Sequence, residues 1–169
     1  ILGPLQVRVG GMSVDPPDVE TWQLLALFAV YADHVVPPHV MVEELWPHGA
    51  PPGALSELHR RVAGLQSRLA RADELAPRDG EAAVSRRRTR GRLVAASGGY
   101  RLDCSHATVD VRQFWRDSGA GFRALAGGDV HTAALRLASA LRLWAGNALV
   151  GVALGPRLRR EVEQLSAAR

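Results

Sequence analysis

The sequence feature that most constrains the fold is a long amphipathic segment at residues 54–72, ALSELHRRVAGLQSRLARA. Its apolar side chains recur at steps of three and four residues, the spacing that places side chains on one stripe of an α-helix. The members of this stripe are Leu55, Leu58, Val62, Leu65 and Leu69. We therefore predict one helix whose leucine stripe faces a hydrophobic core.

The other side of this predicted helix carries small residues and arginines. Its outward positions are Ser56, Arg60, Ala63, Gly64, Ser67 and Arg71, with His59, Arg61 and Arg68 on the flanks. Small residues allow a helix to come close to a large polyanion, and guanidinium groups bind phosphates or guanine edges. A solvated arginine-rich face explains the pattern equally well. The helix alone leaves both interpretations open.

Charge is distributed unevenly along the chain, whose formal net charge is +4. Residues 1–53 contain one arginine and six acidic residues, residues 54–101 contain eleven arginines and five acidic residues, and residues 102–169 contain nine and six. A basic middle segment after an acidic start indicates one surface suited to an anion.

The composition argues against several kinds of protein. No apolar run approaches the roughly 18 residues of a membrane span, so no membrane association is expected. Cys104 is the only cysteine, which leaves no internal disulfide and no cysteine-based zinc site, and the cytoplasm is the expected location. His34, His39 and His48 fall on different predicted elements, so neither a metal nor another cofactor is expected. No segment has the strand context of a phosphate loop or a nucleophile elbow, and we do not expect an enzyme.

The first part of the chain has the signals of a hairpin followed by helices. Residues 5–9 alternate as a strand does, and two glycines before residues 12–14 can turn the chain into a second strand. Asp18 can cap a helix at residues 19–32, and a shorter helix follows at residues 39–46. A tight loop joins this shorter helix to residues 54–72, which predicts a helix-turn-helix arrangement.

After the basic helix, residues 73–91 are rich in charge, glycine and proline, and we predict a mobile basic loop. The loop is either a solvated charge run or a tail that contacts phosphate. Residues 93–102 then form a predicted hairpin, with Arg90, Arg92 and Ser97 at an edge that can lie against a groove. A hairpin, three helices and a terminal hairpin are the order of a winged helix, which we predict for residues 1–103.

The pattern becomes helical from residue 109 onward. Two helical segments are separated by Gly127-Gly128, and a third opens at Pro156, a residue favoured in the first turn of a helix. Paired antiparallel helices of this size predict an all-α, tetratricopeptide-like domain over residues 104–169. Such an array usually binds protein partners on its concave side.

Several motifs occur in an order that resembles one known family. The series LGPLQVRV, LLALFAVYADHVV, VEELWP with a following APP, the basic helix and GGYRLD resembles the Streptomyces antibiotic regulatory protein family. In the second half VDVRQF, AGGD and AALRLASALRLWAGNAL are similar to that family's bacterial transcriptional activation domain. The resemblance covers nearly the whole chain outside residues 73–91.

This resemblance implies an OmpR-type winged helix that binds direct repeats in promoter DNA. It also implies a helical domain that recruits RNA polymerase holoenzyme through its sigma factor, and a homodimer on DNA. Residues 54–72 correspond to the recognition helix and residues 93–102 to the wing. The loop at residues 46–52, with Trp46 and His48, is expected to face the polymerase.

The leading hypothesis is thus a regulator that binds double-stranded DNA, an activator of secondary-metabolite genes. Its predicted DNA contacts are Ser56, His59, Arg60, Arg61, Ser67, Arg68, Arg71, Arg90, Arg92 and Ser97. It requires Arg60 and Ser67 to stay uncovered by the chain itself. The family's recognition helix often ends in Ser-Arg-Leu-Arg-Arg where this chain has residues 63–67, Ala-Gly-Leu-Gln-Ser. That departure motivates a second hypothesis, a protein-interaction scaffold that keeps the fold.

Overall fold

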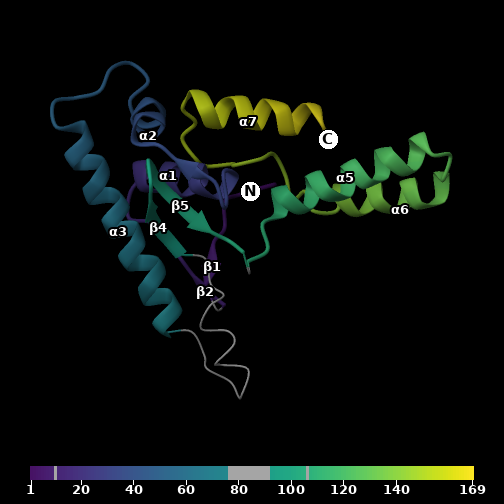
Figure 1. The fold of residues 1–169 in the computed structure, drawn as a ribbon, viewed down its shortest axis with the longest axis horizontal. Coiled ribbons are helices and arrows are strands. Elements are labelled where there is room, and N and C mark those ends of the chain that lie inside the picture. The colour runs from purple at the N-terminus through teal and green to yellow at the C-terminus, as the bar shows by residue number, and fades with distance from the viewer. Residues whose placement is uncertain (10, 76–91, 106) are drawn as a thin grey trace.

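An α+β arrangement of small antiparallel sheets and helices is seen in a computed structural model, which describes residues 1–9, 11–75, 92–105 and 107–169 (Figure 1). Strands β1 (Arg8–Val9) and β2 (Met12–Ser13) pair antiparallel, as the alternating sequence predicts. The predicted loop at residues 73–91 falls mostly on residues 76–91, which lie outside the described residues.

Helix α1 (Val19–Val30) forms the centre of the core. It begins as predicted, because the Asp18 carboxylate accepts a hydrogen bond of 2.8 Å from the Thr21 backbone N–H and so caps the first turn. Leu24, Leu25 and Phe28 have no exposed surface. A helix that is buried on nearly every side matches its apolar sequence.

Helices α2 (Pro38–Leu45) and α3 (Ala54–Leu75) follow in the predicted order. Helix α3 is three residues longer than predicted, so residues 73–75 continue the helix and do not begin the loop.

The hairpin of β4 (Arg92–Ala96) and β5 (Gly99–Asp103) is the predicted one, and Gly98 takes the positive φ of 87° that its turn requires. A strand that the sequence did not predict, β3 (Val35–Val36), pairs with β5 and extends this sheet to the order β3-β5-β4. Its two residues are too few for an alternating pattern to reveal.

The C-terminal helices separate into two groups. Helices α5 (Asp110–Ala126) and α6 (Val130–Leu141) form a pair that projects from the rest of the molecule, with Leu137 packed tightly against Gly121 (Figure 1). Helix α7 (Pro156–Ala167) leaves this pair and packs against α1 and α2. In the described residues, α7 therefore does not stack on α5 and α6 as the next helix of a tetratricopeptide-like array.

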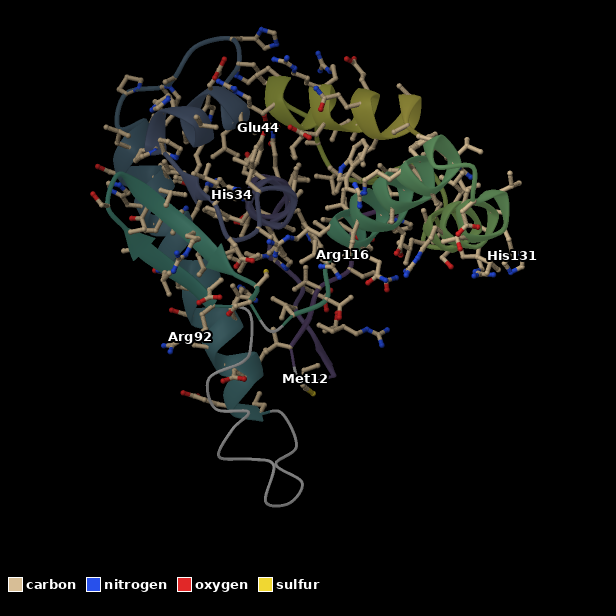
Figure 2. The ribbon with its side chains drawn as sticks, turned by 45° about the vertical axis from the view of Figure 1, so that its right-hand side comes forward. Met12, His34, Glu44, Arg92, Arg116 and His131 are labelled. Atoms are coloured by element: carbon tan, nitrogen blue, oxygen red, sulfur yellow. The ribbon has the colours of Figure 1, made fainter. Side chains whose placement is uncertain are left out.

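Glu44 of α2 fixes the position of α7. Its side chain has no exposed surface, and its two carboxylate oxygens accept hydrogen bonds from the backbone N–H groups of Gly155 and Arg157, both at 2.8 Å. Figure 2 labels Glu44 where α2 meets α7. The carboxylate satisfies donors that the first turn of any helix leaves free. Leu158 and Leu165 of α7 belong to the same apolar core as α1. The predicted division of the chain into two domains at residue 103 stays a prediction.

Candidate nucleic-acid interface

The inner side of α3 is a continuous apolar seam. Its buried residues are Ala54, Leu58, Val62, Leu65, Leu69 and Ala72. The prediction that Leu55 belongs to this seam is wrong, since Leu55 is 54% exposed. Ala54 occupies the seam position four residues before Leu58, and one residue further along rotates the side chain by about 100° away from the core.

The outer side of α3 is open to solvent over its full length. The exposed residues include all but one of the predicted contact residues on this helix: Ser56, His59, Arg60, Ser67, Arg68 and Arg71. Ala63 and Gly64 between them are also exposed, and nothing lies within 4 Å of the position that a Cβ at Gly64 would occupy. The described part of the chain therefore leaves Arg60 and Ser67 uncovered, as the hypothesis requires.

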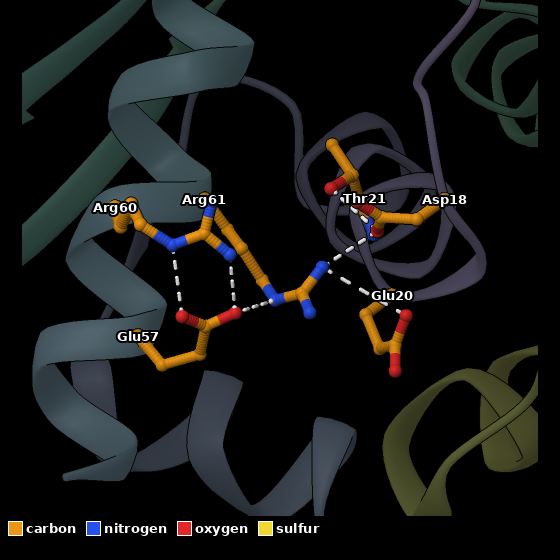
Figure 3. A network of polar contacts seen from close by, with 6 residues as sticks. All are labelled: Asp18, Glu20, Thr21, Glu57, Arg60 and Arg61. Atoms are coloured by element: carbon orange, nitrogen blue, oxygen red, sulfur yellow. Dashed lines mark hydrogen bonds and ion pairs between the residues drawn. The ribbon is translucent and has the colours of Figure 1, made fainter.

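Arg61 is the one predicted contact residue on α3 that is not exposed. Its side chain is only 14% exposed and forms ion pairs of 2.6 Å with Asp18 Oδ1 and 3.8 Å with Glu20 Oε2 (Figure 3). Its Nε also lies 2.9 Å from Glu57 Oε1, an ion pair without hydrogen-bond geometry. Three carboxylates already surround this guanidinium group, so we correct the expectation that Arg61 is available to an external anion.

Glu57 and Arg60 form a second, exposed ion pair. Arg60 donates from Nε to Glu57 Oε2 at 2.9 Å and from Nη2 to Glu57 Oε1 at 2.6 Å (Figure 3). These hydrogen bonds hold the pKa of Glu57 below its ordinary value and raise the pKa of Arg60. Sequence reasoning missed Glu57, although its spacing of three and four residues from two arginines is a signal for such pairs.

Asp18 links this cluster to the start of α1. Burial alone would raise the pKa of Asp18, but hydrogen bonds from the backbone and hydroxyl groups of Thr21 and the charge of Arg61 bring it below the ordinary value. One carboxylate thus caps α1 and binds an arginine of α3, which links the two helices.

The β4–β5 hairpin lies beside α3. Gln66 donates from Nε2 to the Leu93 carbonyl oxygen at 3.0 Å, and the rings of His59 and Tyr100 meet edge to face at 6.2 Å. Arg92, labelled in Figure 2, and Ser97 are both exposed. The hairpin that carries these two predicted residues thus lies beside α3, whereas Arg90 lies outside the described residues.

The loop between α2 and α3 has a different character. Trp46 is half-buried and packs against the core, while His48 is exposed. Of the two residues expected to face a polymerase, only His48 is exposed.

Two further observations concern metal binding and membrane-spanning helices. Among residues 1–9, 11–75, 92–105 and 107–169, no three His, Cys, Asp or Glu side chains are grouped as metal ligands would be. Within the same described ranges, none of the helices has both the length and the apolar character needed to cross a membrane.

Comparison with known proteins gives two relatives of known class. Residues 109–169 match the family described as the bacterial transcriptional activator domain. The whole chain is 35% identical to the regulatory protein DnrI of Streptomyces peucetius and spans 59% of its length. It is also 30% identical over 149 residues to the transcriptional regulatory protein EmbR of Mycobacterium tuberculosis, of which the match spans 35%.

A solved structure supports the fold. The structure of M. tuberculosis EmbR in complex with a low-affinity phosphopeptide matches 99% of this chain and 40% of that chain, with 30% sequence identity and a TM-score of 0.71. The chain thus spans between about a third and three fifths of the relatives it matches. Its activator-domain match and its similarity to both regulators support its assignment to the Streptomyces antibiotic regulatory protein family.

Proposed function

We propose that this chain is a DNA-binding transcriptional regulator in which α3 enters the major groove of a duplex. The observation that carries the proposal is the outer face of α3, where small residues alternate with exposed arginines above a fully buried seam. In this proposal β1–β2, α1–α3 and β4–β5 form a winged helix, with α3 as recognition helix and β4–β5 as wing.

The dimensions of α3 suit this role. Its 22 residues extend about 33 Å at 1.5 Å per residue, and the major groove is about 12 Å wide, enough for a helix. Arg60 and Ser67 would approach base edges, while Arg68 and Arg71 would contact phosphates. Arg92 would contact the backbone near the wing.

The family supplies the rest of the proposed function. The chain would bind direct repeats as a homodimer in the cytoplasm and activate secondary-metabolite genes. The helical part would recruit RNA polymerase through its sigma factor, and His48 would lie on the loop that faces the polymerase.

Salt dependence and two arginine substitutions test the proposal. Six arginines are predicted to contact DNA. With Arg61 paired inside the protein and Arg60 assigned to a base edge, Arg68, Arg71, Arg90 and Arg92 remain for phosphate, and log affinity should fall with log salt at a slope of about −3 to −4. Arg68→Ala should reduce that slope by about one. The measurement is fluorescence polarisation of a mixed-sequence duplex titrated at several salt concentrations.

Arg61→Ala separates DNA contact from folding. Because Arg61 holds Asp18, Glu20 and Glu57 together, its removal should lower the free energy of unfolding by about 1–3 kcal/mol. The salt slope should stay unchanged at a temperature where the variant is folded. A flat salt dependence of the unsubstituted chain would contradict the proposed function.

A protein-interaction scaffold is a second candidate because of one observation. The projecting α5–α6 pair exposes large apolar side chains, with Trp115 at 46%, Phe122 at 60% and Leu135 at 57%. Such side chains are typical of surfaces that bind other proteins. A scaffold should show no salt-sensitive binding to duplex DNA at low salt, which distinguishes it from the regulator.

A further inference from the structure

The Arg60 guanidinium group is held along one edge only. A guanidinium group has five N–H donors, and Arg60 uses Nε and one N–H of Nη2 to bind the two carboxylate oxygens of Glu57. The end of the group, formed by Nη1 and the other N–H of Nη2, has no partner among the described residues. With 69% of the side chain exposed, this end is open to solvent.

The orientation of Arg60 is set by a row of alternating charges. Glu57 binds Arg60 on its outer side and lies against Arg61 on its inner side, and Arg61 is anchored on Asp18 (Figure 3). The row therefore runs from the start of α1 to the exposed face of α3. A long, flexible arginine side chain held in this way loses less conformational freedom when it binds a ligand.

The same pairing lowers the attraction of Arg60 for phosphate. The Glu57 carboxylate cancels the charge of the guanidinium group and would itself be repelled by a phosphate. A neutralised, oriented pair of N–H donors is better suited to a base edge than to the sugar–phosphate backbone, where charge dominates affinity. Guanine presents two acceptors, O6 and N7, at the spacing that the end of an arginine side chain matches.

We propose that Glu57 is a specificity-determining positioning residue, which holds Arg60 so that its terminal N–H groups bind O6 and N7 of a guanine in the major groove. This inference rests on the proposed DNA-binding function. Glu57 acts through Arg60, and its carboxylate needs no contact with the DNA.

Two substitutions of Glu57 should change specificity and affinity in opposite directions. Glu57→Gln removes the negative charge and keeps one acceptor, while Glu57→Ala releases Arg60 altogether. Both variants should bind a mixed-sequence duplex more tightly than the original chain, because Arg60 becomes available to phosphate. Their preference for guanine should fall, by about tenfold in Glu57→Ala, the typical value of one bidentate arginine–guanine contact.

The experiment begins with selection of a duplex from a randomised pool by the full 169-residue chain. A second selection with the Arg60→Ala variant identifies the guanine that Arg60 binds, because guanine is then no longer enriched at that position of the duplex. Each variant is then titrated with the selected duplex, with a copy carrying 7-deazaguanine at that position, and with a mixed-sequence duplex. The 7-deazaguanine lacks only the N7 acceptor, so the original chain should lose affinity for it and Glu57→Ala should not.

Glu74→Gln is the matched control, because it removes the same charge from the exposed last turn of α3, 14 residues from Arg60. It should leave sensitivity to 7-deazaguanine unchanged. The inference is overturned if Glu57→Ala keeps that sensitivity, or if the original chain has none. Absence of any salt-sensitive binding by the original chain would instead refute the proposed function, and this inference with it.

Discussion

Two glutamates on consecutive helices organise two different regions of the molecule. Glu44 of α2 has no exposed surface and binds the backbone N–H groups at the start of α7. Glu57 of α3 has a side chain that is 34% exposed, and it binds the guanidinium groups of Arg60 and Arg61. The first carboxylate joins two segments that are more than a hundred residues apart, whereas the second organises neighbours on one helix.

In our proposal the same side chain serves folding at one of these sites and recognition at the other. The start of a helix carries about half a positive charge and free N–H donors, so Glu44 is satisfied without a cation. In a buried site this arrangement leaves little freedom to rearrange. Around Glu57 the ion pairs are weakened by solvent and salt, so they contribute less to folding and serve instead to orient an exposed guanidinium group. The α2–α7 junction is therefore expected to tolerate substitution far less than the α3 surface.

Removal of the Glu44 carboxylate should have the largest effect on stability. Glu44→Ala leaves the N–H groups of Gly155, Arg157 and Leu158 without their acceptor in a buried site, at a cost of about 1–3 kcal/mol each, before water enters. We expect the free energy of unfolding to fall by about 3–5 kcal/mol. Urea denaturation measures this loss, and hydrogen exchange should show α7 opening first.

The adjacent Glu43 provides the control for this substitution. Its side chain is 51% exposed and lies 3.3 Å from Arg157 Nη2 at the surface. Such a pair contributes about 0–1 kcal/mol, so Glu43→Ala should unfold almost as the original chain does. Equal losses for the two variants would show that the buried hydrogen bonds of Glu44 do not hold α7.

Two glycines extend the comparison from carboxylates to backbone packing. A Cβ at Gly155 would lie 2.2 Å from the Glu44 carbonyl oxygen, so Gly155→Ala must displace α7 and should cost about 1–3 kcal/mol. A Cβ at Gly64 meets nothing, and Gly64→Ala should stabilise α3 by up to about 1 kcal/mol. Thermal unfolding measures whether each substitution raises or lowers the stability of the chain. We expect Gly155→Ala to lower it and Gly64→Ala to raise it, and a stabilised Gly155→Ala would contradict the close packing at this junction.

The elements that the sequence predicted correctly depend on neighbours along the chain. The seam of α3, the cap at Asp18 and the β4–β5 hairpin each follow from a repeat, a cap residue or a glycine turn within a few positions. The exposed arginines follow from the same repeat, because an amphipathic helix that buries its apolar stripe turns its polar side toward solvent. This part of the candidate interface could therefore be predicted.

The features that the sequence did not reveal depend on distant contacts. The helical wheel places Arg61 on a flank of α3, but only the fold brings the start of α1 to that flank. Glu44 looks like any surface glutamate of a short helix until α7 covers it. Helix α7 carries an ordinary amphipathic pattern, which indicates that it packs against something and does not indicate which helix.

The smallest of the expected effects concerns how the stability of the α7 junction and of the α3 cluster depends on pH. Burial, with the hydrogen bond of 2.8 Å to Glu161 on α7, raises the pKa of Tyr31 from 10.0 to about 12. The folded chain therefore favours the neutral phenol more than the unfolded chain does. This contribution is fully present below pH 10 and is lost as the pH rises through about 12.

The carboxylates around α3 respond to pH in the opposite sense. The pKa values of Glu57 and Asp18 are lowered, so their contribution is present above their ordinary values near 4 and is lost as the pH falls below them. Tyr31→Phe should therefore flatten the alkaline side of a plot of melting temperature against pH and leave the acid side unchanged. Tyr100→Phe, on β5 and away from α7, is the control and should keep the alkaline decline. If Tyr31→Phe also shifted the acid side, the α7 junction and the α3 cluster would be coupled, and the division between a folding carboxylate and a recognition carboxylate would no longer hold.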